Sequence, residues 1–324
     1  MATFTPAEIT DLDAFKIGNA QNTEAATGCT VILSLDGAVC GVDVRGGGPA
    51  TRETDLLKPE NMVEAIHAVV LSGGSAFGLA ASTGVMEELE AHNIGFELLG
   101  MHVPIVCGAC LFDLPVGIST IRPDAAMGKA AVQAALAEEP LEQGNIGAGT
   151  GCSVSKLRGM EHAWKSGLGY ATYRFEDVIV GAVVAVNACG NINDRSGATI
   201  AGPADTDHGL ENGIESFKRS VEEQMAQDQT APCTNTTIGC IITNARITKA
   251  QAQKVASTTH DAYARCISPV HTSNDGDTIF CMSSAQVEAP YDLVAVMATE
   301  AMQDAIINGV TNAKPAYGLP GLGK

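Results

Sequence analysis

Hydrophobic residues gather in several short runs that suit buried strands. Residues 178–186 read Val-Ile-Val-Gly-Ala-Val-Val-Ala-Val, an almost unbroken apolar stretch. Such a run is typical of a strand that is covered on both faces. Two further runs, at 236–243 and 277–283, start directly after polar segments. The pattern therefore predicts three buried strands, two of them near the C-terminus.

Other segments space their apolar residues as an amphipathic helix does. The helices predicted in this way cover residues 76–91, 123–138, 248–266 and 292–308. The third of them opens with Thr248-x-x-Gln251, which has the spacing of a capping box.

A further helix is predicted to start at Pro59, because proline suits a first helical turn. Val63, Ile66 and Val70 would then share one face. The segment Ser72-Gly-Gly-Ser75 would end this helix, since glycine disfavours helix interiors. His67 would lie inside the helix as a core histidine whose ring has a hydrogen-bond partner.

Residues 29–44 have the pattern of a β-hairpin. Two apolar segments, 29–35 and 38–44, flank Asp36-Gly37, which is a strong two-residue turn sequence. A hairpin argues against an all-parallel sheet, and strands and helices do not alternate as clean βαβ units. The pattern favours a layered α/β sandwich with mostly antiparallel strands.

The segment 190–235 differs from the rest of the chain because it is polar and rich in Asn, Asp, Gly and Gln. Only residues 214–225 within it have a helical pattern. We interpret it as a loop or linker, after which the buried pattern restarts at Thr236.

Composition narrows the classes of function. The 324 residues include 37 acidic and 19 basic side chains, which gives a net charge of −18. Nucleic-acid binding draws most of its affinity from Lys and Arg, so such a partner is not expected. No apolar stretch has the length of a membrane span, and the first residues do not resemble a signal peptide. We expect a cytoplasmic enzyme without a membrane partner.

The ten cysteines mostly lie in apolar runs and suggest packing residues. Cys107-Gly-Ala-Cys110 has redox or half-zinc-site spacing, but no second pair of this kind follows. The seven histidines form no H-x-x-x-H motif, and no metal site or cofactor is predicted. The glycine-rich segments 46–48 and 147–151 match neither a P-loop nor a dinucleotide fingerprint, and tight turns near a shared site explain them better.

The junction Asn235-Thr236 lies where the polar segment meets a buried strand. A hydroxyl nucleophile needs a base, and a threonine at a chain N-terminus can use its own α-amine. That chemistry would require the chain to cut itself before Thr236; a plain loop-to-strand junction is the simpler alternative. Asp275 and Asp277, two residues apart at a strand entrance, could orient the hydroxyl and amine, or form a solvated turn.

Two further polar residues occupy suggestive positions. Lys156 follows the glycine-rich segment 147–151, and Asn187 ends the most apolar predicted strand. A side-chain amide at such a strand end could donate a hydrogen bond to an oxyanion.

Together these residues resemble the DmpA-type family, the L-aminopeptidase/D-esterase group of self-processing hydrolases. The resemblance extends over nearly the whole chain. The motifs that carry it are Gly41-Val-Asp-Val-Arg-Gly-Gly-Gly-Pro-Ala-Thr-Arg-Glu-Thr-Asp55, Leu71-Ser-Gly-Gly-Ser-Ala-Phe-Gly-Leu79, Gly147-Ala-Gly-Thr-Gly151 with Lys156, Val186-Asn-Ala188, Asn235-Thr-Thr-Ile-Gly239 and His271-Thr-x-x-Asp-Gly-Asp-Thr278. The Asn-Thr junction is most similar to the branch that includes nylon-oligomer hydrolases.

This resemblance implies a four-layer αββα sandwich similar to N-terminal nucleophile hydrolases and ornithine acetyltransferases. It implies one domain, 1–324, that is cut into a large chain, 1–235, and a small chain, 236–324, which assemble into homo-oligomers of heterodimers. The residue roles that it implies are Thr236 as nucleophile, Asn187 as oxyanion donor, Lys156 lining the site, and Asp275 and Asp277 positioning Thr236. Some members have tyrosine where this chain has Phe112, which is a candidate for the substrate pocket. Phenylalanine cannot donate a hydrogen bond, so either Asn187 and backbone N–H groups suffice or the substrate preference differs.

The expected function is hydrolysis of small peptides or peptide-like amides through an acyl-enzyme on Thr236, without a metal or organic cofactor. Endo-hydrolysis of nylon oligomers, as main or side activity, is one alternative. Acyl transfer to an amine, as in ornithine acetyltransferases, ranks lower because their usual junction motif is absent. A non-catalytic scaffold is the alternative from another class of protein.

Overall fold

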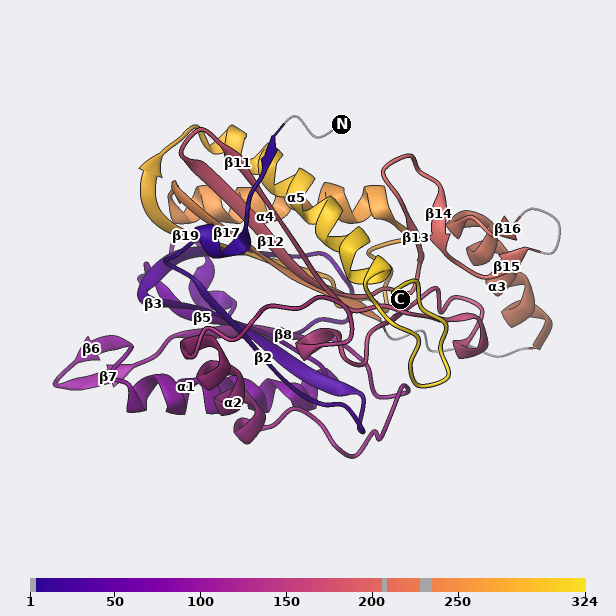
Figure 1. Ribbon diagram of the computed structural model, residues 1–324, viewed down its shortest axis with the longest axis horizontal. Coiled ribbons are helices and arrows are strands. Elements are labelled where there is room, and N and C mark those ends of the chain that lie inside the picture. Colours follow the sequence, from indigo (N-terminus) through magenta and orange to yellow (C-terminus); the bar gives the residue numbers. More distant parts are fainter. Residues whose placement is uncertain (1–3, 206–208, 228–234) are drawn as a thin grey trace.

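The apolar run of residues 178–186 forms most of the strand β12, which belongs to a ten-stranded sheet system in the computed structural model (Figure 1). The structure describes residues 4–205, 209–227 and 235–324. The strands follow the order β1-β11-β12-β17-β19-β3-β5-β8-β4, and β2 pairs with β3. Their bounds are β1 Thr5–Pro6, β2 Lys16–Asn22, β3 Thr27–Val44, β4 Ala50–Arg52, β5 Ile66–Ser72, β8 Val106–Cys110, β11 Leu168–Phe175, β12 Val178–Asn187, β17 Thr236–Arg246 and β19 Thr278–Glu288.

All neighbours in this system are antiparallel except β17 with β19 and β5 with β8. The long strand β3 belongs to two layers, since its first half pairs with β2 and β5 and its second half pairs with β19. The predicted predominance of antiparallel strands is confirmed.

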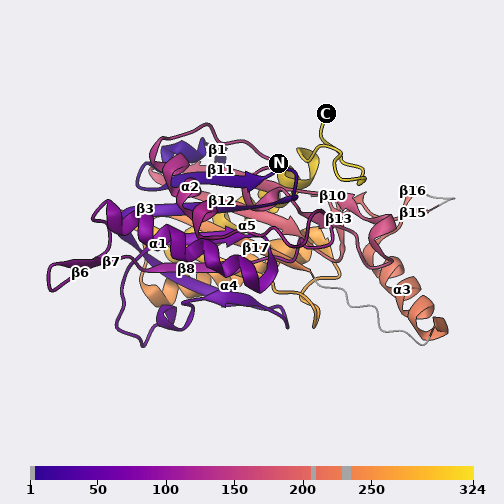
Figure 2. The same ribbon diagram turned by 90° about the horizontal axis from the view of Figure 1, so that it is seen from below.

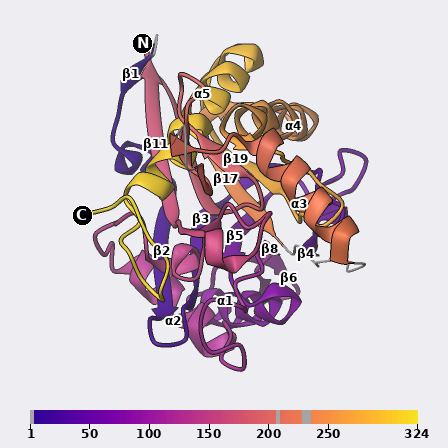
Figure 3. The ribbon, with the colours of Figure 1, turned by 90° about the vertical axis from the view of Figure 1, so that its right-hand side faces the viewer.

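Five helices cover the outer faces of the two layers or extend from them. They are α1 Ala81–Ala91, α2 Ala125–Leu136, α3 Gly213–Gln227, α4 Lys249–Cys266 and α5 Tyr291–Thr311. Helices α4 and α5 lie on one side and α1 and α2 on the other, with the strands between them (Figure 3). Helix α3 extends away from this body (Figure 2).

Alternation along the strands builds three apolar layers. In β12, Val180, Val184 and Val186 pack toward α4 and α5, whereas Ile179 and Val183 face the second sheet. A third cluster joins β3, β5 and β8 to α1 and α2. Because neighbouring residues of a strand point to opposite faces, each strand contributes to two clusters. The predicted four-layer αββα sandwich is confirmed.

Short elements complete the described chain. The strands are β6 Phe96–Leu98, β7 Met101–Val103, β9 Ser153–Val154, β10 Trp164–Lys165, β13 Asn191–Asn193, β14 Thr199–Ala201, β15 Ala204–Asp205, β16 Gly209–Leu210 and β18 Ile267–Ser268. The 3₁₀ helices are η1 Ile9–Asp11, η2 Asp55–Leu57, η3 Ser75–Ala80, η4 Gly147–Gly149 and η5 Met160–His162. None of the helices in the described ranges has both the length and the apolar character needed to cross a membrane.

The predicted hairpin at 29–44 is wrong. Residues Thr27–Val44 form one continuous strand, β3, whose register shifts between Leu33 and Ala38. Gly37 takes a φ of +84° there, so the Asp-Gly pair bends the strand instead of reversing it. The bend lies where β3 passes from one sheet to the other, and pairing on both sides overrides the local turn preference.

The helix predicted from Pro59 is also wrong, because Ile66–Ser72 is the strand β5, buried between β3 and β8. A short apolar run fits a helix face and a doubly covered strand equally well. His67 is nevertheless a core histidine with a partner, since its Nδ1 accepts from the Ile105 N–H at 3.1 Å.

The remaining predicted elements are close to the observed ones. Helix α4 has the predicted capping box, in which Thr248 and Gln251 bond reciprocally. The helical patch at 214–225 lies within α3. The segment 190–235 contains more structure than the predicted linker, with α3 and strands β13 to β16 in its described part.

Candidate active site

The first residue of β17, Thr236, lies beside the last residue of β12, Asn187, in the antiparallel register. The Thr236 Oγ1 hydroxyl donates to the Asn235 carbonyl oxygen, and the Gly276 N–H donates to the same oxygen at 3.0 Å. One peptide carbonyl therefore has a hydroxyl and a backbone donor aimed at it.

Gly276 can approach this closely because it has no side chain. A Cβ atom at this position would lie 2.8 Å from Thr236 Oγ1 and 3.2 Å from Thr236 Cγ2. The glycine between Asp275 and Asp277 is therefore required by the packing against the threonine.

The Asn187 side chain is held in one orientation by bonds on both of its ends. Its Oδ1 accepts from Lys156 Nζ at 2.9 Å and from the Ser153 N–H at 3.1 Å. Its Nδ2 donates to the Phe112 carbonyl oxygen at 2.8 Å. A primary amide carries two N–H bonds on Nδ2, so this donor group has the capacity for a second acceptor.

Lys156 lies in the loop after β9, where its backbone N–H donates to the Cys189 carbonyl at 2.9 Å. Its Nζ bonds both the side chain and the backbone carbonyl of Asn187. The lysine thus fixes the amide at the end of β12. The contact that Phe112 makes with Asn187 is through its backbone, so replacing tyrosine with phenylalanine does not affect this bond.

Asp275 and Asp277 precede β19 and are both buried. Asp275 forms an isolated parallel bridge with Asn235, and its Oδ2 accepts from the Thr272 N–H at 2.6 Å. Asp277 Oδ1 accepts from the Thr237 N–H at 2.8 Å. Burial, followed by the nearby charge of Asp277, raises the pKa of Asp275 to about 6, although Lys156 acts in the opposite direction.

The first glycine-rich segment packs on the acidic loop. The Arg45 N–H donates to the Asp277 carbonyl at 3.0 Å, and the Gly48 N–H donates to the Asp275 carbonyl at 2.8 Å. This segment is a tight turn that packs against the site. The sequence predicts a tight turn here in preference to a phosphate-binding loop.

The structure brings together all five side chains proposed from the sequence, Thr236, Asn187, Lys156, Asp275 and Asp277. The most exposed of them, Lys156, has 8% of its surface accessible. In the uncut chain the site is therefore closed to solvent.

Sequence reasoning missed three supporting groups. His271 bonds Asp277 through its ring, with Nδ1 at 2.8 Å from Oδ2. Asp113 accepts from Thr27 Oγ1 and from the Gly74 N–H, both at 2.7 Å, and burial raises its pKa. Lys165 is wholly buried and donates to the carbonyls of residues 149, 152 and 166.

Burial also lowers the pKa of Lys165 to about 8. Two of its carbonyl partners, Gly149 and Cys152, lie in or directly after the second glycine-rich turn, which leads to Ser153 and so to Asn187. Only His271 lies in a motif that the sequence had singled out; Asp113 and Lys165 are isolated polar residues in apolar surroundings.

The nine cysteines in the described ranges are all buried. Cys107 and Cys110 both lie on β8 and are buried, and burial raises the pKa of Cys107 to about 12 and that of Cys110 further. This agrees with two packed residues and not with a redox pair. Cys233 lies outside the described residues. Within the described ranges no group of three or more His, Cys, Asp or Glu side chains could hold a metal ion.

Comparison with solved structures identifies the fold. The L-aminopeptidase D-Ala-esterase/amidase from Ochrobactrum anthropi, described as a variant of the Ntn hydrolase fold, matches with a TM-score of 0.69 and 18% identity, over 98% of this chain and 91% of that one. A β-aminopeptidase from Burkholderia sp. matches with a TM-score of 0.67 and 18% identity, over 100% of this chain and 93% of that one. The molecule therefore has an α/β fold like this variant of the Ntn hydrolase fold.

The chain belongs to peptidase family S58, whose model matches residues 7–322. An uncharacterized aminopeptidase of Mycobacterium leprae (strain TN) is 40% identical over 302 residues, which cover 87% of this chain and 79% of the relative. The 6-aminohexanoate-oligomer endohydrolase of Paenarthrobacter ureafaciens is 33% identical over 285 residues, 86% of this chain and 76% of the relative. The protein is thus a hydrolase of peptide or amide bonds, and the scaffold hypothesis loses its support.

Proposed function

We propose that the chain cuts itself between Asn235 and Thr236 and then hydrolyses small peptides or peptide-like amides with Thr236 as nucleophile. The observation that carries this proposal is the Asn235 carbonyl, which is held between Thr236 Oγ1 and the Gly276 N–H. The large chain would be 1–235 and the small chain 236–324, both parts of one domain.

The first step is an N-to-O acyl shift. Thr236 Oγ1 bonds to the Asn235 carbonyl carbon, the carbon–nitrogen bond breaks, and the hydroxyl proton ends on the Thr236 nitrogen. Negative charge develops on the Asn235 oxygen, where the Gly276 N–H already donates. Water then hydrolyses the ester, which releases the Asn235 carboxylate and restores the hydroxyl.

In the mature site the freed α-amine of Thr236 takes the proton of its own hydroxyl during attack on a substrate amide. The acyl group is carried on Oγ1 and the leaving amine receives the proton. Water then hydrolyses this ester, which releases the acid and restores the Thr236 hydroxyl. Asn187 Nδ2 stabilises the oxyanion through its second N–H, while Lys156 keeps the amide in this orientation. Loss of one such donor lowers the rate about 100- to 1000-fold.

Asp275 is suited to proton transfer during both steps. Its pKa of about 6 is near neutral, and its bridge to Asn235 keeps it beside the junction. Asp277 fixes the start of β17 by accepting from the Thr237 N–H.

Hydrolysis of 6-aminohexanoate oligomers is the second candidate activity, because a relative named for it is 33% identical to this chain. Such oligomers contain the same amide bond in an unbranched chain. Transfer of the acyl group to an amine acceptor ranks below both hydrolyses. Assembly of the two-piece units into a homo-oligomer stays a prediction.

Intact-mass measurement of purified wild type, Thr236→Ala and Thr236→Ser tests the self-cleavage. We expect two fragments from wild type, one uncut chain from the alanine variant, and slower cutting by the serine variant, which keeps a hydroxyl. A folded wild-type chain that stays at full length would overturn the proposal.

A substrate panel then separates the candidate activities. It contains aminoacyl nitroanilides, β-peptides and 6-aminohexanoate oligomers, each with and without an added amine acceptor. Product that carries the acceptor indicates transfer, and free acid alone indicates hydrolysis.

A further inference from the structure

Two residues, Thr237 and His271, supply hydrogen bonds to the Asp277 carboxylate. Oδ1 accepts from the Thr237 N–H at 2.8 Å, next to the proposed nucleophile. Oδ2 accepts from the His271 N–H at 3.2 Å and lies 2.8 Å from His271 Nδ1. Because a carboxylate only accepts, the His271 ring carries its proton on Nδ1.

His271 is placed for this contact by its backbone and by ring packing. Its φ of +58° is left-handed, a conformation in which His and Asn are enriched. Its ring meets the His260 ring edge-on at 4.8 Å and stacks on the Tyr263 ring at 6.1 Å. Its Nε2 is buried and has no partner among the described residues, so the ring's one polar contact there is with Asp277.

The two rings behind His271 are themselves fixed and uncharged. His260 Nε2 lies 3.2 Å from the Asp43 carbonyl oxygen and therefore carries the proton. Burial lowers the pKa of His260 to about 4, so the ring is neutral at neutral pH. The Tyr263 hydroxyl is wholly buried, and burial raises its pKa strongly.

We propose that His271 is a positioning residue of the site: its Nδ1–H holds the Asp277 carboxylate in the orientation that fixes Thr237 and, through it, the nucleophile Thr236. The rings of His260 and Tyr263 pack against the His271 ring and hold it in place. The inference rests on the proposed function, because it assigns His271 a part in the reaction of Thr236. It also links α4, which carries His260 and Tyr263, to the first residues of β17.

Titratable and charged groups surround the His271–Asp277 contact from several elements. Asp275 on the same loop and Tyr263 on α4 interact with Asp277 itself. Lys156 after β9 acts on Asp275, and Asp43 and Arg45 around the end of β3 act on His260. Loss of a donor to the charged form of a carboxylate raises its pKa. The Asp277 charge raises the pKa of Asp275, so a change at Asp277 also alters the titration of Asp275.

The test compares His271→Gly with His271→Asn. Glycine accepts the left-handed backbone and keeps the N–H bond to Asp277, but it removes the ring. Asparagine tolerates the same backbone and places an N–H near the position of Nδ1. His102→Gly, in the distant β6–β7 hairpin, is the control for loss of an imidazole (Figure 1).

For His271→Gly we expect the rate of self-cleavage and kcat to fall about 10- to 100-fold, with KM changed less than threefold. The acid limb of the pH–rate profile should move to higher pH. His271→Asn should recover most of kcat and return the limb toward its wild-type position, and His102→Gly should match wild type.

A folded His271→Gly variant with wild-type kcat and pH limb would overturn the inference, as would a folded His271→Asn variant that is impaired as much as the glycine variant. If the glycine variant does not fold, His271→Asn decides alone: kcat within about threefold of wild type supports the role, and a loss of tenfold or more refutes it. A wild type that neither cuts itself nor hydrolyses amides instead refutes the proposed function.

Discussion

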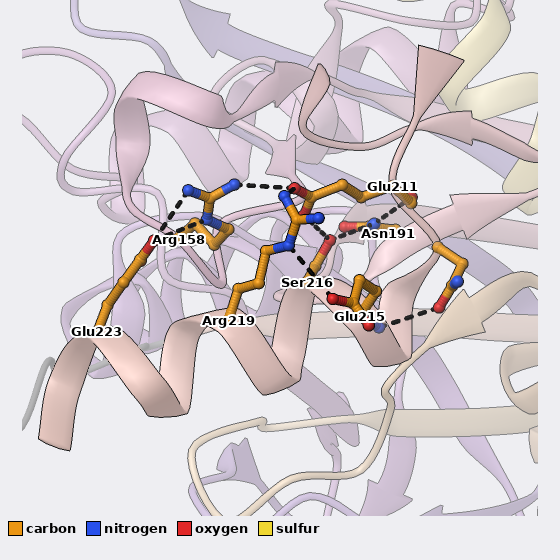
Figure 4. Close-up of polar contacts among 8 residues, drawn as sticks. Arg158, Asn191, Glu211, Glu215, Ser216, Arg219 and Glu223 are labelled. Atoms are coloured by element: carbon orange, nitrogen blue, oxygen red, sulfur yellow. Dashed lines mark hydrogen bonds and ion pairs between the residues drawn. The ribbon is translucent and has the colours of Figure 1, made fainter. Parts of the chain in front are cut away.

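Two buried acidic centres lie on either side of the Asn235–Thr236 junction in the sequence: Glu211 before it, and the pair Asp275 and Asp277 after it. They differ in the groups that bind their carboxylates. The Glu211 carboxylate has no exposed side-chain surface and meets two arginines, Arg158 at 2.9 Å and Arg219 at 2.7 Å (Figure 4). Ser216 Oγ donates to it at 2.9 Å as well. Two cations and a hydroxyl therefore satisfy one buried negative charge.

The pair Asp275 and Asp277 places two carboxylates together. The donors that hold them are backbone N–H groups and the His271 ring. Lys156 lowers the pKa of Asp275, but burial and Asp277 outweigh it, and the result is a pKa of about 6. This centre takes up a proton in a pH range where an exposed aspartate would stay charged.

The difference separates a structural charge from a reactive one. A carboxylate that is paired with two arginines ties elements together, here α3 to the loop that carries Lys156 and Arg158. Asp275, whose pKa burial and the Asp277 charge raise to about 6, can gain or lose a proton near neutral pH, as general acid–base chemistry requires. Replacing each carboxylate with the amide of the same shape should therefore have opposite consequences. Glu211→Gln should lower stability and keep activity, whereas Asp275→Asn should lower activity and raise stability.

The largest effect is expected from Asp275→Asn on activity. The amide cannot take up a proton near neutral pH, so self-cleavage and kcat should each fall about 100-fold or more. Time courses of fragment formation and steady-state kinetics measure the two rates. Glu211→Gln, assayed at a temperature where it is folded, should stay within about threefold of wild type. If both variants lose activity equally, the distinction between the two centres fails.

The next effect is the loss of stability in Glu211→Gln. The change keeps the shape of the side chain but leaves Arg158 and Arg219 without their shared carboxylate. We expect the free energy of unfolding to fall by about 2–4 kcal/mol, below the range for a fully buried pair because both arginines reach solvent. Denaturant unfolding should be measured in a Thr236→Ala background, so that all chains share one covalent state. An unchanged midpoint would contradict the structural role.

Asp275→Asn, measured in the Thr236→Ala background, should raise the free energy of unfolding by a smaller amount than Glu211→Gln lowers it. The folded-state pKa of Asp275 is raised from 3.8 to about 6, so the wild type loses stability as pH rises through this window. The amide removes this loss and can still accept from the Thr272 N–H. The variant should be more stable by about 1–2 kcal/mol at pH 8 and equal to its parent below pH 4. Destabilisation at pH 8 would argue against the raised pKa.

The sequence was sufficient for the layered fold and for selecting five polar side chains that the structure places together; their catalytic roles stay a prediction. Long elements with one consistent period, such as β12 and α4, are set by their own residues, and Thr236 and Asn187 mark the ends of such strands. The errors at β3 and β5 have one cause: pairing with neighbours on both sides decides between a turn, a helix and a strand, and a short window contains no information about those neighbours.

The two acidic centres also differ in how far the local sequence predicts them. Asp275 and Asp277 are adjacent in a motif and could be found together, whereas Arg158 and Glu211 are 53 residues apart in a polar segment that resembles a linker. His271 lies within the quoted motif, but its contact with Asp277 depends on a left-handed backbone that the motif does not specify. Local spacing therefore indicated the reactive centre and gave no sign of the structural one.

The smallest predicted effect concerns the outer edge of the Glu211 centre. Glu223 bonds Arg158 at 2.8 Å, a distance close to those around Glu211, but 45% of its side chain is exposed. Water screens that pair and hydrates either partner when the other is removed, so Glu223→Gln should lower the free energy of unfolding by less than about 0.5 kcal/mol. Measured beside Glu211→Gln in the Thr236→Ala background, it shows whether burial or the number of ion pairs gives this centre its strength. A loss above about 1 kcal/mol would mean that the arginine network acts as one unit, and that the buried carboxylate is not its centre.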